Sequence, residues 1–116
     1  MPKTTLDVVT AAARLAGVAA VDVPLDSQDY ANCEPIYLSM MDALYVKDEF
    51  YELSDPNAVP LWAFNPVFEM LGLKIAAHYG RPPPVGADWD RAHRSLSRYH
   101  WDDDRGSAPP KETAFY

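Results

Sequence analysis

The chain is poor in cysteine, long apolar runs and basic side chains. Cys33 is the single cysteine among 116 residues, which excludes an internal disulfide and a cysteine-rich zinc site. No stretch approaches the length of a membrane span, and the N-terminus lacks the apolar run of a signal peptide. We therefore expect a protein that is made in a cytoplasm and has no contact with a membrane.

Motifs of catalysis and phosphate binding are also lacking. The sequence holds no glycine-rich phosphate loop, no G-x-S-x-G elbow and no H-E-x-x-H helix. His93 and His100 lie on the apolar side of an expected helix, where a core histidine is the commoner role. Cys33 has no histidine close in sequence to activate it. Carboxylate pairs such as Glu34 and Asp42 are too common in an acidic chain to indicate a hydrolase. We expect a protein that is not an enzyme and that uses no cofactor or metal.

The net charge of −7 is unevenly distributed. Residues 1–60 hold three basic and ten acidic side chains, whereas residues 61–101 hold five basic and three acidic ones. An acidic chain is poorly suited to gripping the phosphate backbone of nucleic acid. The asymmetry allows the basic part of one copy to face the acidic part of another. Solubility alone is an equally good explanation of the acidic excess.

Apolar side chains recur at helical spacing in four segments, which predicts an all-α fold. We expect a small bundle of about four helices, with a short extended segment and an extended C-terminal tail. The first helix runs over residues 5–16, with Thr4 as its N-cap and Gly17 as its stop. The second begins with Ser27 as its N-cap and runs to about residue 45. Pro35 either kinks this helix or begins its regular part, and the in-phase apolar spacing favours a kink.

Residues 45–53 fit either a short strand or an extended arm. The third helix begins at Pro60 and stops at Gly80, and Asn65-Pro66 fits a second start inside it. This helix is apolar on nearly every side, so it must be covered on every side. We expect a second copy to supply part of that cover and part of the cover of the first helix. Val8 and Leu15 are therefore assigned to contacts between subunits, and residues 6–16 are expected to gain order on assembly.

The fourth expected helix, over residues 88–101, is amphipathic. One side carries Arg91, Arg94 and Arg98, at spacings of three and four. Such a row is most often a solvated face, and it also fits an acidic partner surface or nucleic acid. On the strength of the charge asymmetry, we expect these arginines to face an acidic patch of an adjacent copy.

Residues 102–116 are rich in acidic, small and proline side chains, which cannot build a core. We therefore divide the chain into a bundle over residues 1–101 and a tail over residues 102–116. The tail ends on Phe115 and Tyr116, two aromatic side chains that a purely solvating tail does not need. We expect Arg105, Phe115 and Tyr116 to bind a partner protein or a neighbouring subunit.

The helix signatures resemble those of the head-to-tail adaptor proteins of tailed bacteriophages. The likeness is carried by residues 5–9 (TLDVV), residues 13–18 (ARLAGV), the Val59-Pro60 start of the third helix and its Tyr79-Gly80 stop. A further short helix like residues 89–99 usually follows in that family. The nearest group is the tail accessory factors, or packaged-DNA-stabilisation proteins, of short-tailed phages. The likeness covers residues 4–101; Pro35 and the short central extended segment depart from it.

The resemblance implies a structural virion protein at the interface of head and tail, made in the host cytoplasm. Such adaptors attach beneath the portal protein as a homo-oligomeric ring, commonly dodecameric. The ring extends the DNA channel, through which packaged DNA passes without sequence-specific binding, and offers a platform to the next tail or nozzle protein. The alternative is a small helical regulatory module that binds a single protein partner through its arginine row. A small hydrolase that uses carboxylates is a third and weaker alternative.

Overall fold

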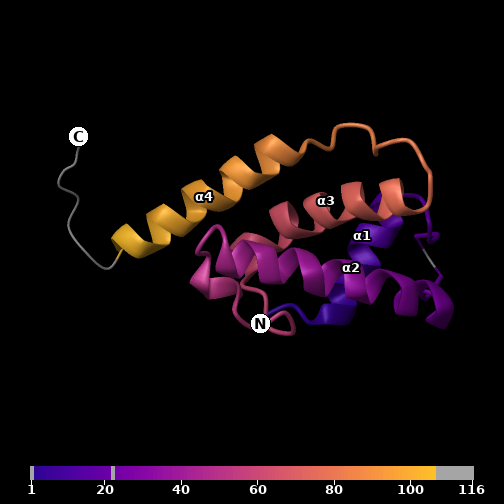
Figure 1. The fold of residues 1–116 in the computed structure, drawn as a ribbon, viewed down its shortest axis with the longest axis horizontal. Helices are drawn as coiled ribbons and strands as arrows, with labels where there is room; N and C mark the ends of the chain where they lie inside the picture. Colours follow the sequence, from indigo (N-terminus) through magenta and orange to yellow (C-terminus); the bar gives the residue numbers. More distant parts are fainter. Residues whose placement is uncertain (1, 22, 107–116) are drawn as a thin grey trace.

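Four α-helices and one short 3₁₀ helix make up the described part of the chain, which is all-α as predicted. The computed structural model describes residues 2–21 and 23–106, with side chains described through residue 98. In chain order the elements are α1 (Thr5–Leu15), α2 (Ser27–Val46), the 3₁₀ helix η1 (Tyr51–Leu53), α3 (Leu61–His78) and α4 (Trp89–Gly106) (Figure 1).

The ends of α1 are fixed by its own sequence. The Thr4 hydroxyl accepts a hydrogen bond from the Asp7 N–H at 3.2 Å, and the Thr4 N–H donates to the Asp7 carboxylate at 3.1 Å. This reciprocal pair is a capping box, and the bond from the Thr4 N–H lowers the pKa of Asp7. At the other end Gly17 has a φ of 79° and the Val18 N–H donates to the Ala13 carbonyl at 2.9 Å. The predicted cap and stop are confirmed.

The helix α3 forms the centre of the molecule, and much of the cover of this helix comes from the chain itself. It packs against α1, α4 and α2 and buries eight residues, which are Ala63, Pro66, Val67, Met70, Leu71, Gly72, Ile75 and Ala76. The contact with α1 is close: a Cβ at Gly72 would lie 3.0 Å from the Leu15 Cδ2 atom and 3.4 Å from the Ala12 carbonyl oxygen. Much of the cover of α1 and α3 thus comes from helices of the same chain, whereas Leu6 of α1 and Leu61 of α3 are exposed. The expectation that a second copy supplies part of the cover stays a prediction.

The helix α2 is one helix that continues through Pro35, as the in-phase apolar spacing favoured. Its N-cap is Asp26, whose carboxylate accepts from the Gln28 N–H at 3.1 Å, and not the predicted Ser27. It buries Cys33, Tyr37, Met40, Met41 and Leu44 against the other helices. The segment 45–53 forms neither a strand nor an arm, because its first two residues end α2 and its last three form η1. An isolated antiparallel bridge joins Lys3 to Val59.

The helix α3 is likewise continuous through Pro66, so the second start at Asn65-Pro66 is not used. Pro60 is the N-cap of α3 and not its first helical residue. Both prolines in helix interiors remove one backbone donor. Each lies in a helix that is packed on several neighbours, and this packing supplies more stabilisation than one missing hydrogen bond removes.

The helix α4 runs antiparallel to α3 and extends past the other three helices at its C-terminal end (Figure 1). Ala92 and Leu96 are its buried contacts with the body. It is helical through Gly106, the last residue that the structure describes, so residues 102–106 of the predicted tail are helical. None of the helices in the described ranges combines the length and apolarity that crossing a bilayer requires.

Candidate functional site

The arginine row of α4 divides into one side chain that holds the fold and two that face outward. The Arg91 Nη2 atom lies 2.6 Å from the Glu69 Oε2 atom of α3 and also donates to the Gly86 carbonyl. Arg91 therefore joins α4 to α3 and to the connecting loop within one chain. Arg94 and Arg98 are exposed. Among the side chains that the structure describes, none forms a hydrogen bond or an ion pair with either of them.

Glu69 fixes the start of α4 on the middle of α3. Its Oε2 atom accepts from the Asp88 N–H at 2.9 Å as well as from Arg91. Asp88 in turn caps α4, because its carboxylate accepts from the Arg91 N–H at 3.2 Å. Negative charge near a helix N-terminus is stabilised by the helix dipole. Two carboxylates, one from each element, therefore define where α4 begins.

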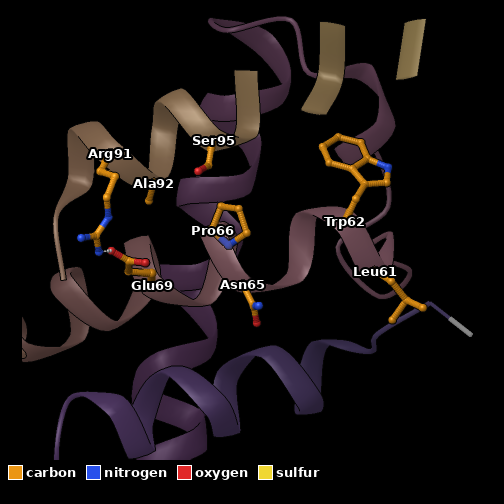
Figure 2. A pocket seen from close by; sticks show the side chains of 8 residues that line it. All are labelled: Leu61, Trp62, Asn65, Pro66, Glu69, Arg91, Ala92 and Ser95. Atoms are coloured by element: carbon orange, nitrogen blue, oxygen red, sulfur yellow. Dashed lines mark hydrogen bonds and ion pairs between the residues drawn. The ribbon is translucent and has the colours of Figure 1, made fainter. Parts of the chain in front are cut away.

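A groove of about 400 Å³ separates the two helices beside this contact. Figure 2 shows the Arg91–Glu69 pair at one end, Trp62 at the other, and Pro66 and Ser95 between them. Leu61, Asn65 and Ala92 complete the lining. The groove thus combines an aromatic wall with one charged end. Within the lining, the Ser95 hydroxyl has no histidine beside it that could act as its base.

His93 fixes α4 from its other flank. Its Nε2 atom lies 3.2 Å from the Asp48 Oδ2 atom, just after the end of α2, and its ring centroid is 5.5 Å from that of Phe50. Trp89 adds a third contact, since the Lys74 Nζ atom lies 5.1 Å from the centre of its ring. His93 is thus a half-buried packing residue. The side chain of His100 lies outside the described side chains.

The residues assigned from sequence to contacts between subunits lie in different environments. Val8 is fully buried in the core, so its side chain is not available to a neighbouring copy. Leu15 is half-buried and its Cδ2 atom packs over Gly72 of α3. Both side chains lie on the apolar face of α1, and this face packs against the rest of the same chain. Arg94 and Arg98 remain as surface residues of that set.

The three residues expected to bind the portal protein or a neighbouring subunit lie at or beyond the limit of the description. Arg105 belongs to the last turn of α4, and its side chain is not among those described. Phe115 and Tyr116 lie outside the described residues.

The helix α2 carries a surface that sequence reasoning missed. Leu38 and Tyr45 are exposed on α2, and the ring of Tyr51 of η1 lies beside that of Tyr45. The signal was present in the sequence: two large side chains seven residues apart on one face, in a helix with no lysine or arginine. The same helix also presents a buried apolar face, so the spacing alone does not separate the exposed pair from the packed residues.

The chemistry available elsewhere in the described chain is limited. Burial raises the pKa of Cys33, so this side chain stays a protonated thiol at neutral pH and is a poor nucleophile. The described residues contain no group of three or more histidine, cysteine or acidic side chains placed to hold a metal ion. Comparisons of the chain with protein-family models, with curated proteins and with solved structures find no match.

Proposed function

We propose that the chain is a structural virion protein, a head-to-tail adaptor that assembles as a homo-oligomeric ring beneath a phage portal protein. In this role it extends the DNA channel and presents a surface to the next tail or nozzle protein. The observation that carries the proposal is the division of the molecule into a closed three-helix body and a fourth helix that runs beyond it (Figure 1). The helix signatures of residues 4–101, which resemble adaptor proteins, agree with this role.

The outlying end of α4 supports the proposal because it has the properties of an arm. Among its described side chains, which reach residue 98, the buried contacts with the body are Ala92 and Leu96, and the helix continues through Gly106. The residues that follow end on Phe115 and Tyr116. An arm that leaves the body and ends on large aromatic side chains suits attachment to a neighbouring protein, because such side chains dominate interface energetics when they fill a pocket.

The surface charge supports passage of DNA through the ring. The chain carries a net charge of −7, and Arg91, the first arginine of α4, is neutralised by Glu69. An acidic lining repels the phosphate backbone, so DNA slides past without being held. The exposed Arg94 and Arg98 are then left for protein contacts.

The experiment that tests the proposal mixes the purified chain with portal rings encoded in the same genome. We expect rings of the chain to attach to the portal, as seen by electron microscopy and by co-sedimentation. Deleting residues 106–116, or replacing both Phe115 and Tyr116 with alanine, should leave helicity unchanged and reduce attachment. Val85→Ala is the matched control, because Val85 is a fully exposed apolar residue in the loop before α4.

Two results would count against the proposal. If the chain stays monomeric and does not bind the portal at any concentration tested, it is not an adaptor. A tight one-to-one complex with a single protein would instead support a regulatory module. If the truncated chain attaches as well as the whole chain, the arm has no part in docking.

A further inference from the structure

One side of α2 exposes large apolar side chains. Leu38 is 43% exposed and Tyr45 39%, and they lie seven residues apart on the same face of the helix. Tyr51 of η1, 60% exposed, extends this surface, because its ring packs edge-on against that of Tyr45 at a centroid distance of 5.8 Å. We call Leu38, Tyr45 and Tyr51, with the acidic residues described next, the α2 face. A surface cluster of this size needs a partner more often than single exposed apolar residues do.

The α2 face is also acidic. Asp42 is exposed and lies between Leu38 and Tyr45 on the same side of the helix. Glu49 is exposed in the turn that follows, and its carbonyl accepts from the Tyr51 N–H at 3.0 Å. The last turn of α2 contains no basic residue, so the negative end of the helix dipole adds to these carboxylates. The nearest lysine, Lys47, follows at the C-cap, half a turn around the helix from Tyr45.

The α2 face points away from α4 of the same chain. The residues of α2 that turn toward α3 and α4 line a separate hollow with Lys74 and Trp89, and they include Ile36, Ser39 and Ala43. At 100° per residue these positions lie on a different side of α2 from Leu38, Asp42 and Tyr45. Leu38, Asp42 and Tyr45 therefore do not face α4 of their own chain.

We infer that the α2 face receives Arg94 and Arg98 from α4 of a second copy of the chain, and that this contact joins neighbours in the ring. The inference rests on the proposed ring and names its two surfaces. Guanidinium groups stack on tyrosine rings and pair with carboxylates, so Tyr45 and Tyr51 supply the stacking surface and Asp42 and Glu49 the charge. Two different patches that fit each other form a head-to-tail contact, which closes into a ring when the rotation allows it.

A charge exchange tests this contact. Arg98→Glu and Asp42→Arg should each weaken self-association by about tenfold or more, with a larger effect at low salt, where exposed charges are least screened. Combining the two changes restores the pair with its polarity reversed, so association should recover most of the loss. Arg94→Glu serves as a second variant of the arginine side. Sedimentation velocity over a range of concentrations measures the association, and circular dichroism checks that each variant keeps its helices.

Lys47→Glu is the matched control. It makes the same change in net charge as Arg98→Glu on an exposed residue outside both surfaces, so it should leave association unchanged. Single variants that weaken association without any rescue in the combination would overturn the pairing. If rings form on the portal equally well with Arg98→Glu and with Asp42→Arg, the inference is wrong, whereas the proposed function is still supported. A chain that forms no ring with or without the portal would overturn both.

Discussion

Two tyrosine hydroxyls tie α2 to segments far along the chain. The Tyr37 hydroxyl donates to the Pro56 carbonyl at 2.7 Å, which holds the loop before α3 against the middle of α2. The Tyr79 hydroxyl, at the end of α3, donates to the Asp29 carboxylate at 2.9 Å near the start of α2. Burial is the largest cause of a raised pKa at both residues, and it raises the pKa of Tyr79 to about 12. Both side chains therefore fold in the protonated form.

The raised pKa of Tyr79 predicts a loss of stability in alkali. The ordinary tyrosine pKa is 10.0, so the stability that the protonated hydroxyl contributes is complete below pH 10 and is lost as the pH rises toward 12. Denaturant midpoints measured at a series of pH values should fall through this window. Tyr79→Phe should flatten the fall, whereas Tyr51→Phe, on an exposed tyrosine, should not. A midpoint that is constant between pH 10 and pH 12 would contradict the prediction.

The described side chains of α4 reach residue 98, and two of them, Ala92 and Leu96, are buried. Glu69 and His93 fix the first turns of the helix by polar contacts. Because the described apolar contacts are few, these polar contacts carry a large share of the docking of the first turns. The element that forms the proposed arm is therefore also one whose docking depends on a few side chains.

Removing the Glu69 carboxylate should loosen α4 selectively. In Glu69→Ala the Asp88 N–H and Arg91 both lose their acceptor, at a cost of about 1–2 kcal/mol. Hydrogen exchange should quicken at the first two turns of α4 and stay unchanged in α1. Asp90→Ala is the control, since it removes an exposed carboxylate from the same first turn. Equal exchange in the two variants would show that Glu69 does not hold α4.

At the scale of the whole molecule, a closed body is joined to an open arm, and the dimensions of 48 × 26 × 26 Å reflect this asymmetry. The face of α1 that contacts the body is fully buried within one chain, at Val8, Val9, Ala12 and Ala13. The body therefore buries this face within one chain, whereas Leu6 of α1 and Leu61 of α3 remain exposed. Surfaces available to neighbours include the outer side of α4 and the α2 face.

This division predicts where order is gained on assembly. In a dilute monomer, amide exchange should be slow in α1 and α3 and fast in the second half of α4. In the assembled ring, new protection should appear in α4 and at the end of α2, and α1 should change little. A large gain of protection in residues 6–16 on assembly would instead support a body that is incomplete in the monomer.

The positions of the helices along the chain follow from local sequence signals. Which residues of other helices each helix contacts does not. The capping pair of Thr4 and Asp7 and the positive φ of Gly17 act within one helix, so the sequence was enough to place the ends of α1. The contact of Arg91 with Glu69 joins residues 22 positions apart, and helical spacing contains no information about such a pair. For the same reason periodicity identified Val8 as apolar without revealing that α3 of the same chain covers it.

The end of α4 shows a second limit. The change to acidic composition at residue 102 suggested a tail, but the helix continues through residues 102–106. The arginine row was likewise identified as a set, and only the structure separates Arg91, which is held within the chain, from Arg94 and Arg98.

The burial of Cys33 makes this chain convenient for site-directed labelling. Its thiol is inaccessible and stays protonated, so it should not react with a maleimide while the protein is folded. A cysteine introduced on the outer side of α4 would then be the one reactive thiol, with no need to replace the natural one. A fluorophore there, paired with an acceptor attached beside Tyr51 on another copy, would report through energy transfer how closely two neighbours approach.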